Sequence, residues 1–378
     1  MSEYQYYEWQ TLERPLTTDE QKAVNSLSSH IDVTSSQAIV TYEWSNFKHD
    51  SIQVLAKYFD SFLYLANWGT RRLAFRFPKG LVDEAALAPY CDKYHLTFKD
   101  TGRVQILEFN VDEEEGFEDW MDTRGVLSTL SRLRDDILQG DFRALYLAWL
   151  KAMSMESDDN EEDEDDPESL SSDPEPPLPA GLRQLTPPLK ELIDFFEIDD
   201  HLVAAAAQRS PDLSPASQVD YARLIRRLSR PECDDFLLKF ANNENGTTAA
   251  LRKNLLGFEK VEPAALNQPR TFGELLKAAD ELEMDEKRRQ AEKRRKAHVA
   301  EMQNLAKRET QTWQEIETLL QGRTTKAYNE ATALLEKLQQ LAEFQDTQVL
   351  FQQQIHSLAE RFKGRTSLIA RWKAKGWV

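Results

Sequence analysis

One stretch divides the chain in two: Glu156-Ser-Asp-Asp-Asn-Glu-Glu-Asp-Glu-Asp-Asp-Pro-Glu-Ser-Leu-Ser-Ser-Asp-Pro-Glu175. It holds 12 carboxylates and neither lysine nor arginine, and more prolines follow it. Such a run buries too little apolar surface to offset the entropy of ordering, and its charges repel one another. We therefore predict a disordered acidic and proline-rich linker over residues 154–180, between a strand-rich head and an all-helical tail.

The charge of the 378-residue chain is concentrated in this linker. The formal net charge of −18 falls to −6 when the 12 linker carboxylates are left out. The acidity argues for solubility and against non-specific nucleic-acid binding by the chain as a whole. The two cysteines, Cys91 and Cys233, lie on opposite sides of the linker, so a reduced, cytoplasmic protein is expected. The first ten residues do not resemble a signal peptide, and no apolar run is long enough to span a membrane.

The head, residues 1–153, alternates between strand and helix patterns. Residues 4–9 are a dense aromatic cluster, interpreted as a strand or an extended arm, with a ligand-stacking surface as the alternative. Runs of β-branched and aromatic residues predict strands at 37–44, 62–66, 73–77, 94–98 and 104–109. Helical spacing and capping residues predict helices at 18–28, 50–59 and 83–91. The order β-α-β-β-α-β plus one strand predicts a ferredoxin-like α+β domain. A closing helix is expected over 126–153, broken or kinked at Gly140.

The tail is predicted to be all-α. Short amphipathic helices over residues 181–268 are expected to pack as a small bundle. A long charged helix and a C-terminal helical hairpin follow over 269–378. Thr271-Phe-Gly-Glu274 has capping-box spacing, and a continuous helix over 271–320 would span about 75 Å. Its apolar stripe vanishes over 283–298, which is typical of a solvent-bridging arm and disfavours a continuous coiled coil.

Motifs for enzymatic chemistry were not found. The chain has no Rossmann or P-loop fingerprint, no G-x-S-x-G and no H-E-x-x-H. Its six histidines lack metal-ligand spacing, and neither cysteine belongs to a C-x-x-C pair. The acidic run over 112–119 is interpreted as a solvated loop. No catalytic residue, cofactor or metal is therefore predicted.

Two segments are candidate binding surfaces. The first is the turn that carries Trp68, Arg71 and Arg72, whose guanidiniums would suit a phosphate or carboxylate. The alternative is a packed turn whose arginines pair with nearby acids. The second is a dense basic patch made of Lys287, Arg288, Arg289, Lys293, Arg294, Arg295 and Lys296. It is interpreted as a solvated helical arm, with docking of the acidic linker and binding of nucleic acid as alternatives.

Several motifs resemble an uncharacterised family of bacterial cytosolic proteins. They are Tyr6-Tyr-Glu-Trp9, Arg14-Pro-Leu16, Tyr58-Phe-Asp60, Ala66-Asn-Trp-Gly-Thr-Arg-Arg-Leu73, Gly140-Asp-Phe-Arg-Ala-Leu-Tyr-Leu-Ala-Trp149 and Arg365-Thr-Ser-Leu-Ile369. The resemblance covers most of the chain and is weakest in the acidic linker. It implies a bacterial origin and carries over no activity, cofactor or active site.

The sequence therefore favours a non-enzymatic interaction or adaptor protein. It would bind a protein partner through its helical tail or through the Trp68 turn, without a membrane partner. One alternative is a nucleic-acid-associated accessory protein that uses residues 287–296. The other is an enzyme of unrecognised type with a site in the head.

Overall fold

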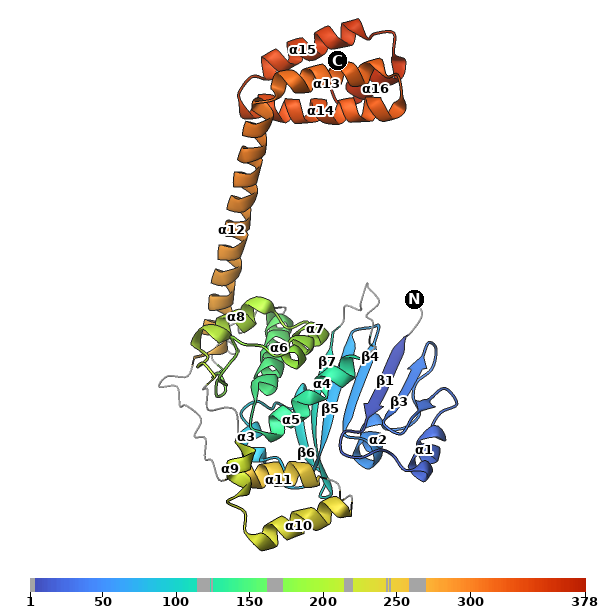
Figure 1. Cartoon of the computed structure of the whole chain (residues 1–378), viewed down its shortest axis with the longest axis vertical. Coiled ribbons are helices and arrows are strands. Elements are labelled where there is room, and N and C mark those ends of the chain that lie inside the picture. Colours follow the sequence, from blue (N-terminus) through green and yellow to red (C-terminus); the bar gives the residue numbers. More distant parts are fainter. Residues whose placement is uncertain are drawn as a thin grey trace. The chain divides into compact units, whose positions relative to one another are not determined.

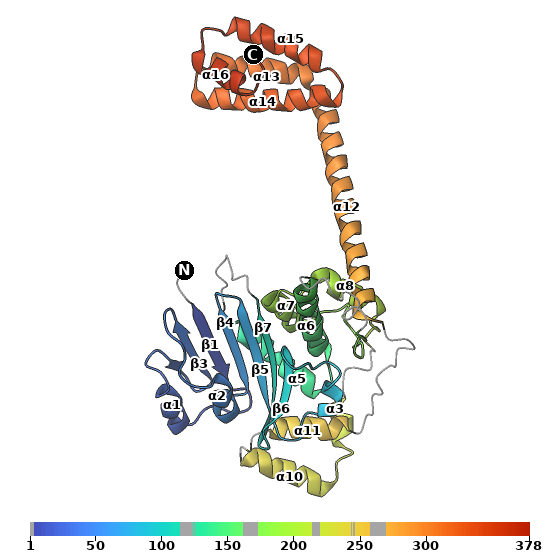
Figure 2. The ribbon, with the colours of Figure 1, turned by 180° about the vertical axis from the view of Figure 1, so that it is seen from behind.

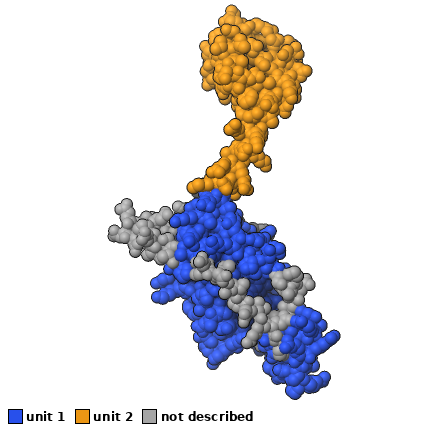
Figure 3. Space-filling view, turned by 90° about the vertical axis from the view of Figure 1, so that its left-hand side faces the viewer, with its two compact units in different colours: residues 1–283 blue, residues 284–378 orange. Residues whose placement is uncertain are grey.

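The computed structural model describes residues 4–113, 123, 125–161, 173–213, 220–242, 244, 246–257 and 270–378. The chain forms two compact units, Met1–Glu283 and Met284–Val378 (Figure 3). An α+β region followed by an all-helical region is confirmed. Helix α12 (Phe272–Ala306) begins in unit 1 and ends in unit 2. Within the described residues, no helix is both long enough and apolar enough to cross a membrane.

The strands of unit 1 form one sheet. They are β1 (Gln5–Gln10), β2 (Asp32–Val33), β3 (Gln37–Tyr42), β4 (Ser61–Ala66), β5 (Thr70–Pro78), β6 (Leu96–Asp100) and β7 (Val104–Asp112). In the described residues this is a seven-stranded sheet of order β2-β3-β1-β4-β5-β7-β6 (Figure 1). Each neighbouring pair is antiparallel. The five strands predicted over 37–109 are all present, because local β-branched and aromatic runs are strong strand signals.

The N-terminal strand occupies the interior of the sheet. The aromatic cluster at 4–9 had been expected as a strand or an arm, and it forms β1, between β3 and β4. All six residues of β1 are buried, since the sheet is covered on both faces at this point. The N-terminal segment is therefore central to the fold.

The ferredoxin-like strand order is not confirmed. The described strands are joined by two crossovers, one through α2 (Ser51–Tyr58) and one through α3 (Glu84–Leu87). In a ferredoxin-like sheet, the two strands that one crossover joins have between them a strand that belongs to the other crossover. Here the crossover from β3 to β4 encloses β1, and the crossover from β5 to β6 encloses β7. The pairing of β1 with two strands distant in sequence produces the different order.

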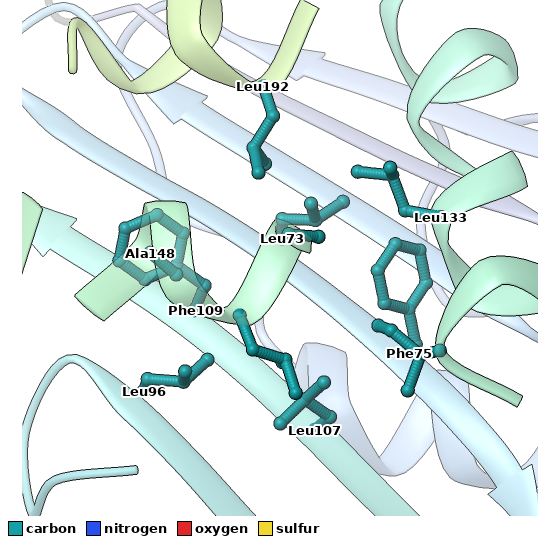
Figure 4. Close-up of a pocket in the computed structure, with 11 residues that line it drawn as sticks. Leu73, Phe75, Leu96, Leu107, Phe109, Leu133, Ala148 and Leu192 are labelled. Atoms are coloured by element: carbon teal, nitrogen blue, oxygen red, sulfur yellow. The ribbon is translucent and has the colours of Figure 1, made fainter. Parts of the chain in front are cut away.

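One face of the sheet is covered by helices. They are α4 (Val126–Leu130), α5 (Arg132–Leu138), α6 (Arg143–Glu161), α7 (Pro187–Phe196) and α8 (Asp200–Arg209). Figures 1 and 2 show from opposite sides that these helices lie on one face of the sheet. Their apolar side chains join Leu73, Phe75 and Phe109 of the sheet in one core. A hollow of about 20 Å³ within this core is lined by apolar side chains, among them Leu133 and Leu192 (Figure 4). Since it lacks polar partners for a water, it is a packing defect and no ligand site.

The other face carries an aromatic core. Residues adjacent on a strand point to opposite faces, so Tyr7 and Trp9 lie here while Tyr6 joins the helix-covered side. Trp9 is fully buried, and its Nε1 donates to the backbone oxygen of Ser51 at 3.1 Å. Helices α1 (Thr18–Asn25) and α2 begin at the predicted caps, a capping box at Thr17 and the side chain of Asp50.

The predicted closing helix over 126–153 is three helices instead of one. Gly140, at φ +82°, lies between α5 and α6, as the sequence had suggested. The break between α4 and α5 falls at Ser131 and had not been expected. The Ser131 hydroxyl bonds the Leu127 carbonyl at 2.6 Å and meets the hydroxyl of Ser61 on the sheet at 2.9 Å. This contact depends on a residue 70 positions away in the sequence.

The acidic segment differs from the predicted linker at both of its described ends. Helix α6 continues to Glu161, past the expected start at residue 154. After the segment, Glu175 is buried and pairs with Arg270 through two contacts, Nε–Oε2 at 3.0 Å and Nη2–Oε1 at 2.8 Å. Its backbone N–H donates to the Arg270 carbonyl at 2.8 Å. The counter-charge lies 95 residues away, so local composition did not reveal it. Residues 162–172 lie outside the described residues.

A second buried charge network joins the chain after β1 to the sheet. Asp60 accepts from the backbone N–H groups of Leu12 at 2.7 Å and Glu13 at 3.0 Å, and it pairs with Arg76. Arg134 of α5 donates to the Arg76 carbonyl at 2.7 Å and pairs with Glu13. Burial by itself raises the pKa of Asp60, but the nearby guanidiniums and the backbone donor outweigh it, so the pKa lies below its ordinary value.

The helices after the acidic segment do not form one separate bundle. Helices α7 and α8 contribute to the core of the sheet. Helix α11 (Thr247–Leu256) contacts α9 (Tyr221–Ile225), α10 (Arg230–Ala241) and α5. The backbone N–H of Gly246, before α11, donates to Glu13.

Unit 2 is a helical bundle around its own core. Its helices after α12 are α13 (Glu309–Gln321), α14 (Thr325–Phe344), α15 (Gln348–Arg361) and α16 (Thr366–Ala374). The helix predicted over 271–320 begins at its capping box but ends at Ala306, before α13. Ile316, Leu335, Ile355 and Trp372 are fully buried in this core. The predicted hairpin of two helices is present as α14 and α15, joined through Asp346 at φ +56°.

Candidate functional site

The turn between β4 and β5 holds the first predicted binding surface. Trp68 is 39% exposed, and its indole Nε1 donates to the Thr70 hydroxyl at 2.9 Å. The Thr70 hydroxyl donates in turn to Asp112 Oδ1 at 2.6 Å. Hydrogen bonds within the fold therefore orient the indole at the surface.

Arg71 is fully buried, so its guanidinium is not accessible to an external ligand. It pairs with Glu197, just after α7, and its Nη1 lies 3.6 Å from Glu113 Oε2. Lys151 of α6 also pairs with Glu113. These contacts join the sheet to its covering helices. Because Arg71 and Arg72 are consecutive on a strand, they point to opposite faces and do not form one guanidinium clamp.

Arg72 is also engaged within the protein. Its Nε donates to Glu108 of β7 at 2.8 Å, and its guanidinium lies 5.8 Å from the centre of the Phe62 ring. The side chain is 27% exposed. The geometry fits the packed-turn alternative, in which both arginines pair with acids of the fold.

The predicted basic patch lies on α12 and is exposed along its whole length, since residues 284–298 all face solvent. Arg288 pairs with Asp285 at 3.3 Å and Lys296 with Glu292 at 2.6 Å. In the described part of the chain, four of its basic side chains form no ion pair, namely Arg289, Lys293, Arg294 and Arg295. At about 100° per residue, the patch surrounds the helix instead of forming one face.

Unit 2 holds a groove lined by three of its helices. It encloses about 410 Å³ between α13 and α15, over α14. Its apolar side chains come from all three helices: Trp313, Leu338, Leu341, Leu350 and Phe351. The rings of Trp313 and Phe351 lie 6.0 Å apart between centres. A cavity of this size falls within the range of ligand-binding pockets.

The rim of the groove is polar and acidic. Glu309 is the only charged lining residue, and glutamine side chains make up much of the remainder. Beside the groove, Phe344, Val349 and Leu350 expose between 43% and 70% of their surface. The indole Nε1 of Trp313 is buried and lacks a hydrogen-bond partner within the described residues. An apolar floor, an acidic rim and an unsatisfied donor occur together here.

Sequence reasoning did not find this groove. It identified the core stripes of α14 and α15, but Phe344, Val349 and Leu350 lie outside those stripes. Apolar residues on the polar side of an amphipathic helix were the available signal. Leu350 and Trp313 line the same groove only because three helices pack together.

Comparison of the chain with models of protein families, with curated proteins and with solved structures gave no match. The resemblance to a bacterial family therefore receives no support from these comparisons.

Proposed function

We propose that this protein is a non-enzymatic interaction protein whose unit 2 groove binds an amphipathic helix of a partner protein. The observation that carries the proposal is the 410 Å³ groove with exposed Val349 and Leu350 at its edge. Helical ligands bind such grooves by inserting apolar side chains spaced three and four residues apart. Aromatic residues such as Trp313 and Phe351 are common at the centres of interfaces.

The charge of the rim selects the kind of partner. No lysine or arginine lines the groove, while Glu309 does, and Glu343 and Asp346 lie at the nearby end of α14. The matching ligand is a helix with apolar anchors flanked by basic residues, because complementary charges favour association and disfavour acidic competitors. A side-chain acceptor of this helix that reaches Trp313 Nε1 would supply the hydrogen-bond partner that this donor lacks within the described residues. The free cysteines Cys91 and Cys233 support a reducing, cytoplasmic setting.

The test uses a displayed library of amphipathic helical peptides, selected against the full chain. Ser357→Tyr fills the groove from its rim, and Leu350→Ser removes an exposed apolar contact. Leu237→Ser is the matched control, because Leu237 is 63% exposed on α10 of unit 1. Selected peptides should carry basic flanks and bind both groove variants about tenfold or more weakly, a loss of about 1.4 kcal/mol.

Binding to the control should be unchanged. If no helical peptide is enriched, or if the enriched peptides bind Ser357→Tyr as tightly as the wild type, the groove is not the binding surface.

The exposed basic patch of α12 favours a second candidate, a nucleic-acid-associated protein. Unit 2 holds 18 lysines and arginines against 12 acids, although the whole chain has a net charge of −18. Each phosphate contact releases counterions from the DNA. The logarithm of the association constant therefore falls with the logarithm of the salt concentration, with a slope of about −0.9 per contact. Replacing Arg294 and Arg295 by glutamine should therefore reduce the salt slope for a random-sequence DNA duplex by about two. The same substitution at Lys373 is the control, and absence of binding at low salt would remove this candidate.

A further inference from the structure

Three potential metal ligands from two separate parts of unit 1 converge beside β6. Asp92 and His95 lie in the turn before this strand, and Glu156 lies on α6, 61 residues after His95. One donor atom from each residue falls within 4.8 Å of the other two. His95 Nδ1 lies 3.2 Å from Asp92 Oδ2 and 4.0 Å from Glu156 Oε1. All three side chains are partly buried, with 17–33% of their surface exposed.

The turn fixes Asp92 in position for a ligand role. Its Oδ1 accepts from three backbone N–H groups, those of Tyr94 at 2.7 Å, His95 at 2.6 Å and Leu96 at 3.1 Å. These bonds leave Oδ2 directed at the imidazole.

We propose that Asp92, His95 and Glu156 form a binding site for a first-row transition-metal dication, for which Zn²⁺ is the probe. Ligand atoms about 2.1 Å from a tetrahedral zinc ion lie roughly 3.4 Å apart. The distance of 3.2 Å between His95 Nδ1 and Asp92 Oδ2 is close to this value, and the distance of 4.0 Å between His95 Nδ1 and Glu156 Oε1 is somewhat longer.

The donor set selects the class of metal. An imidazole nitrogen favours zinc and its neighbours over Mg²⁺ and Ca²⁺, which prefer all-oxygen sites. Three protein ligands leave a position for water, as in zinc sites that remain open. The alternative is a cluster without a metal, held by the 3.2 Å contact between His95 Nδ1 and Asp92 Oδ2. Metal titration separates the two cases.

The test is calorimetric titration of the tag-free full chain with Zn²⁺, repeated for His95→Ala and Glu156→Gln. His201→Ala is the matched control, because His201 is a partly buried histidine outside the cluster, with its Nδ1 3.8 Å from Asp199 Oδ1. The wild type should bind one zinc ion per chain and gain thermal stability from it. Both site variants should bind about tenfold or more weakly, while the control stays within about twofold of the wild type.

Thermal unfolding without metal checks that each variant is folded. Glu156→Gln keeps the shape of the side chain, so it tests the site even if His95→Ala destabilises the turn. Absence of zinc binding by the wild type, or equal binding by both site variants, would overturn the proposal. The second result would indicate zinc bound elsewhere, for instance at a cysteine.

Discussion

At the scale of single residues, buried arginines organise unit 1. Arg71, Arg134 and Arg270 are each at most 4% exposed, and each meets a carboxylate from a distant part of the chain. Removing one partner of a buried pair leaves an uncompensated charge, which costs more than an exposed pair contributes. These residues are therefore sensitive positions of the fold.

Arg270→Met should lower the free energy of unfolding of unit 1 by about 3–5 kcal/mol. The substitution leaves the Glu175 carboxylate buried, with Tyr146 as a remaining hydrogen-bond donor. Urea unfolding measures the effect. Lys22→Met is the control, because its pair with Asp19 is exposed and contributes less than about 1 kcal/mol. A cost below about 1 kcal/mol for Arg270→Met would contradict this account.

Asp136 should make stability depend on pH. Partial burial, followed by the charge of Asp141, raises its pKa from 3.8 to about 6. Since the folded pKa exceeds the unfolded one, the folded state binds more protons between these values, and stability is lost as pH rises from about 4 to 6. Asp136→Asn removes this loss.

The variant should therefore be more stable than the wild type by roughly 1–2 kcal/mol above pH 6, allowing for partial exposure. Below about pH 4 the two proteins should be equally stable, because the unfolded and folded carboxyls are then both protonated. Unfolding curves across this range provide the measurement. A difference that does not vary with pH would exclude titration of Asp136 as its cause.

At the scale of elements, two hairpin turns in the same sheet impose different demands. Gly69, in the β4–β5 turn, has φ +108°, and an added Cβ would lie 2.0 Å from the backbone oxygen of Glu113. Gly102, in the β6–β7 turn, has φ +81° with no atom within 4 Å of an added Cβ. Both glycines adopt a left-handed backbone conformation. Only at Gly69 is the space for a Cβ also occupied, by the backbone of Glu113.

Gly102→Ala should cost about 1 kcal/mol, the penalty of placing a side chain at positive φ. Gly69→Ala should cost more than about 2 kcal/mol, because the Glu113 backbone must also move. Both costs come from urea unfolding of the same unit, so the comparison is internal. Equal losses in the free energy of unfolding would show that the backbone around Glu113 can shift without an energetic cost.

At the scale of the whole molecule, the two units have separate cores. Leu63 is fully buried in unit 1, and Ile355 is fully buried in unit 2. Units with their own cores commonly unfold as separate cooperative transitions.

Calorimetry of the full chain should resolve two transitions. Leu63→Ala and Ile355→Ala should each destabilise their own unit by about 2–5 kcal/mol and shift one transition only. Because the substitutions are of similar size, each serves as the control for the other. A single transition that moves in both variants would show that the units unfold together.

Local signals in the sequence determined much of the secondary structure and little of the site. The caps at Thr17, Asp50 and Thr271 involve residues at most three positions apart, so the sequence predicted them correctly. Strand and helix periodicities were readable for the same reason. The basic patch was also found, because it is a property of one helix.

Tertiary structure decided what depends on residues far apart in the chain. Long-range pairing placed β1 inside the sheet, buried Arg71 against Glu197 and joined Glu175 to Arg270. The groove of unit 2 needs three helices, and the proposed metal ligands come from two separate segments. Composition and periodicity describe a residue's neighbours in sequence, whereas burial and site geometry follow from its neighbours in space.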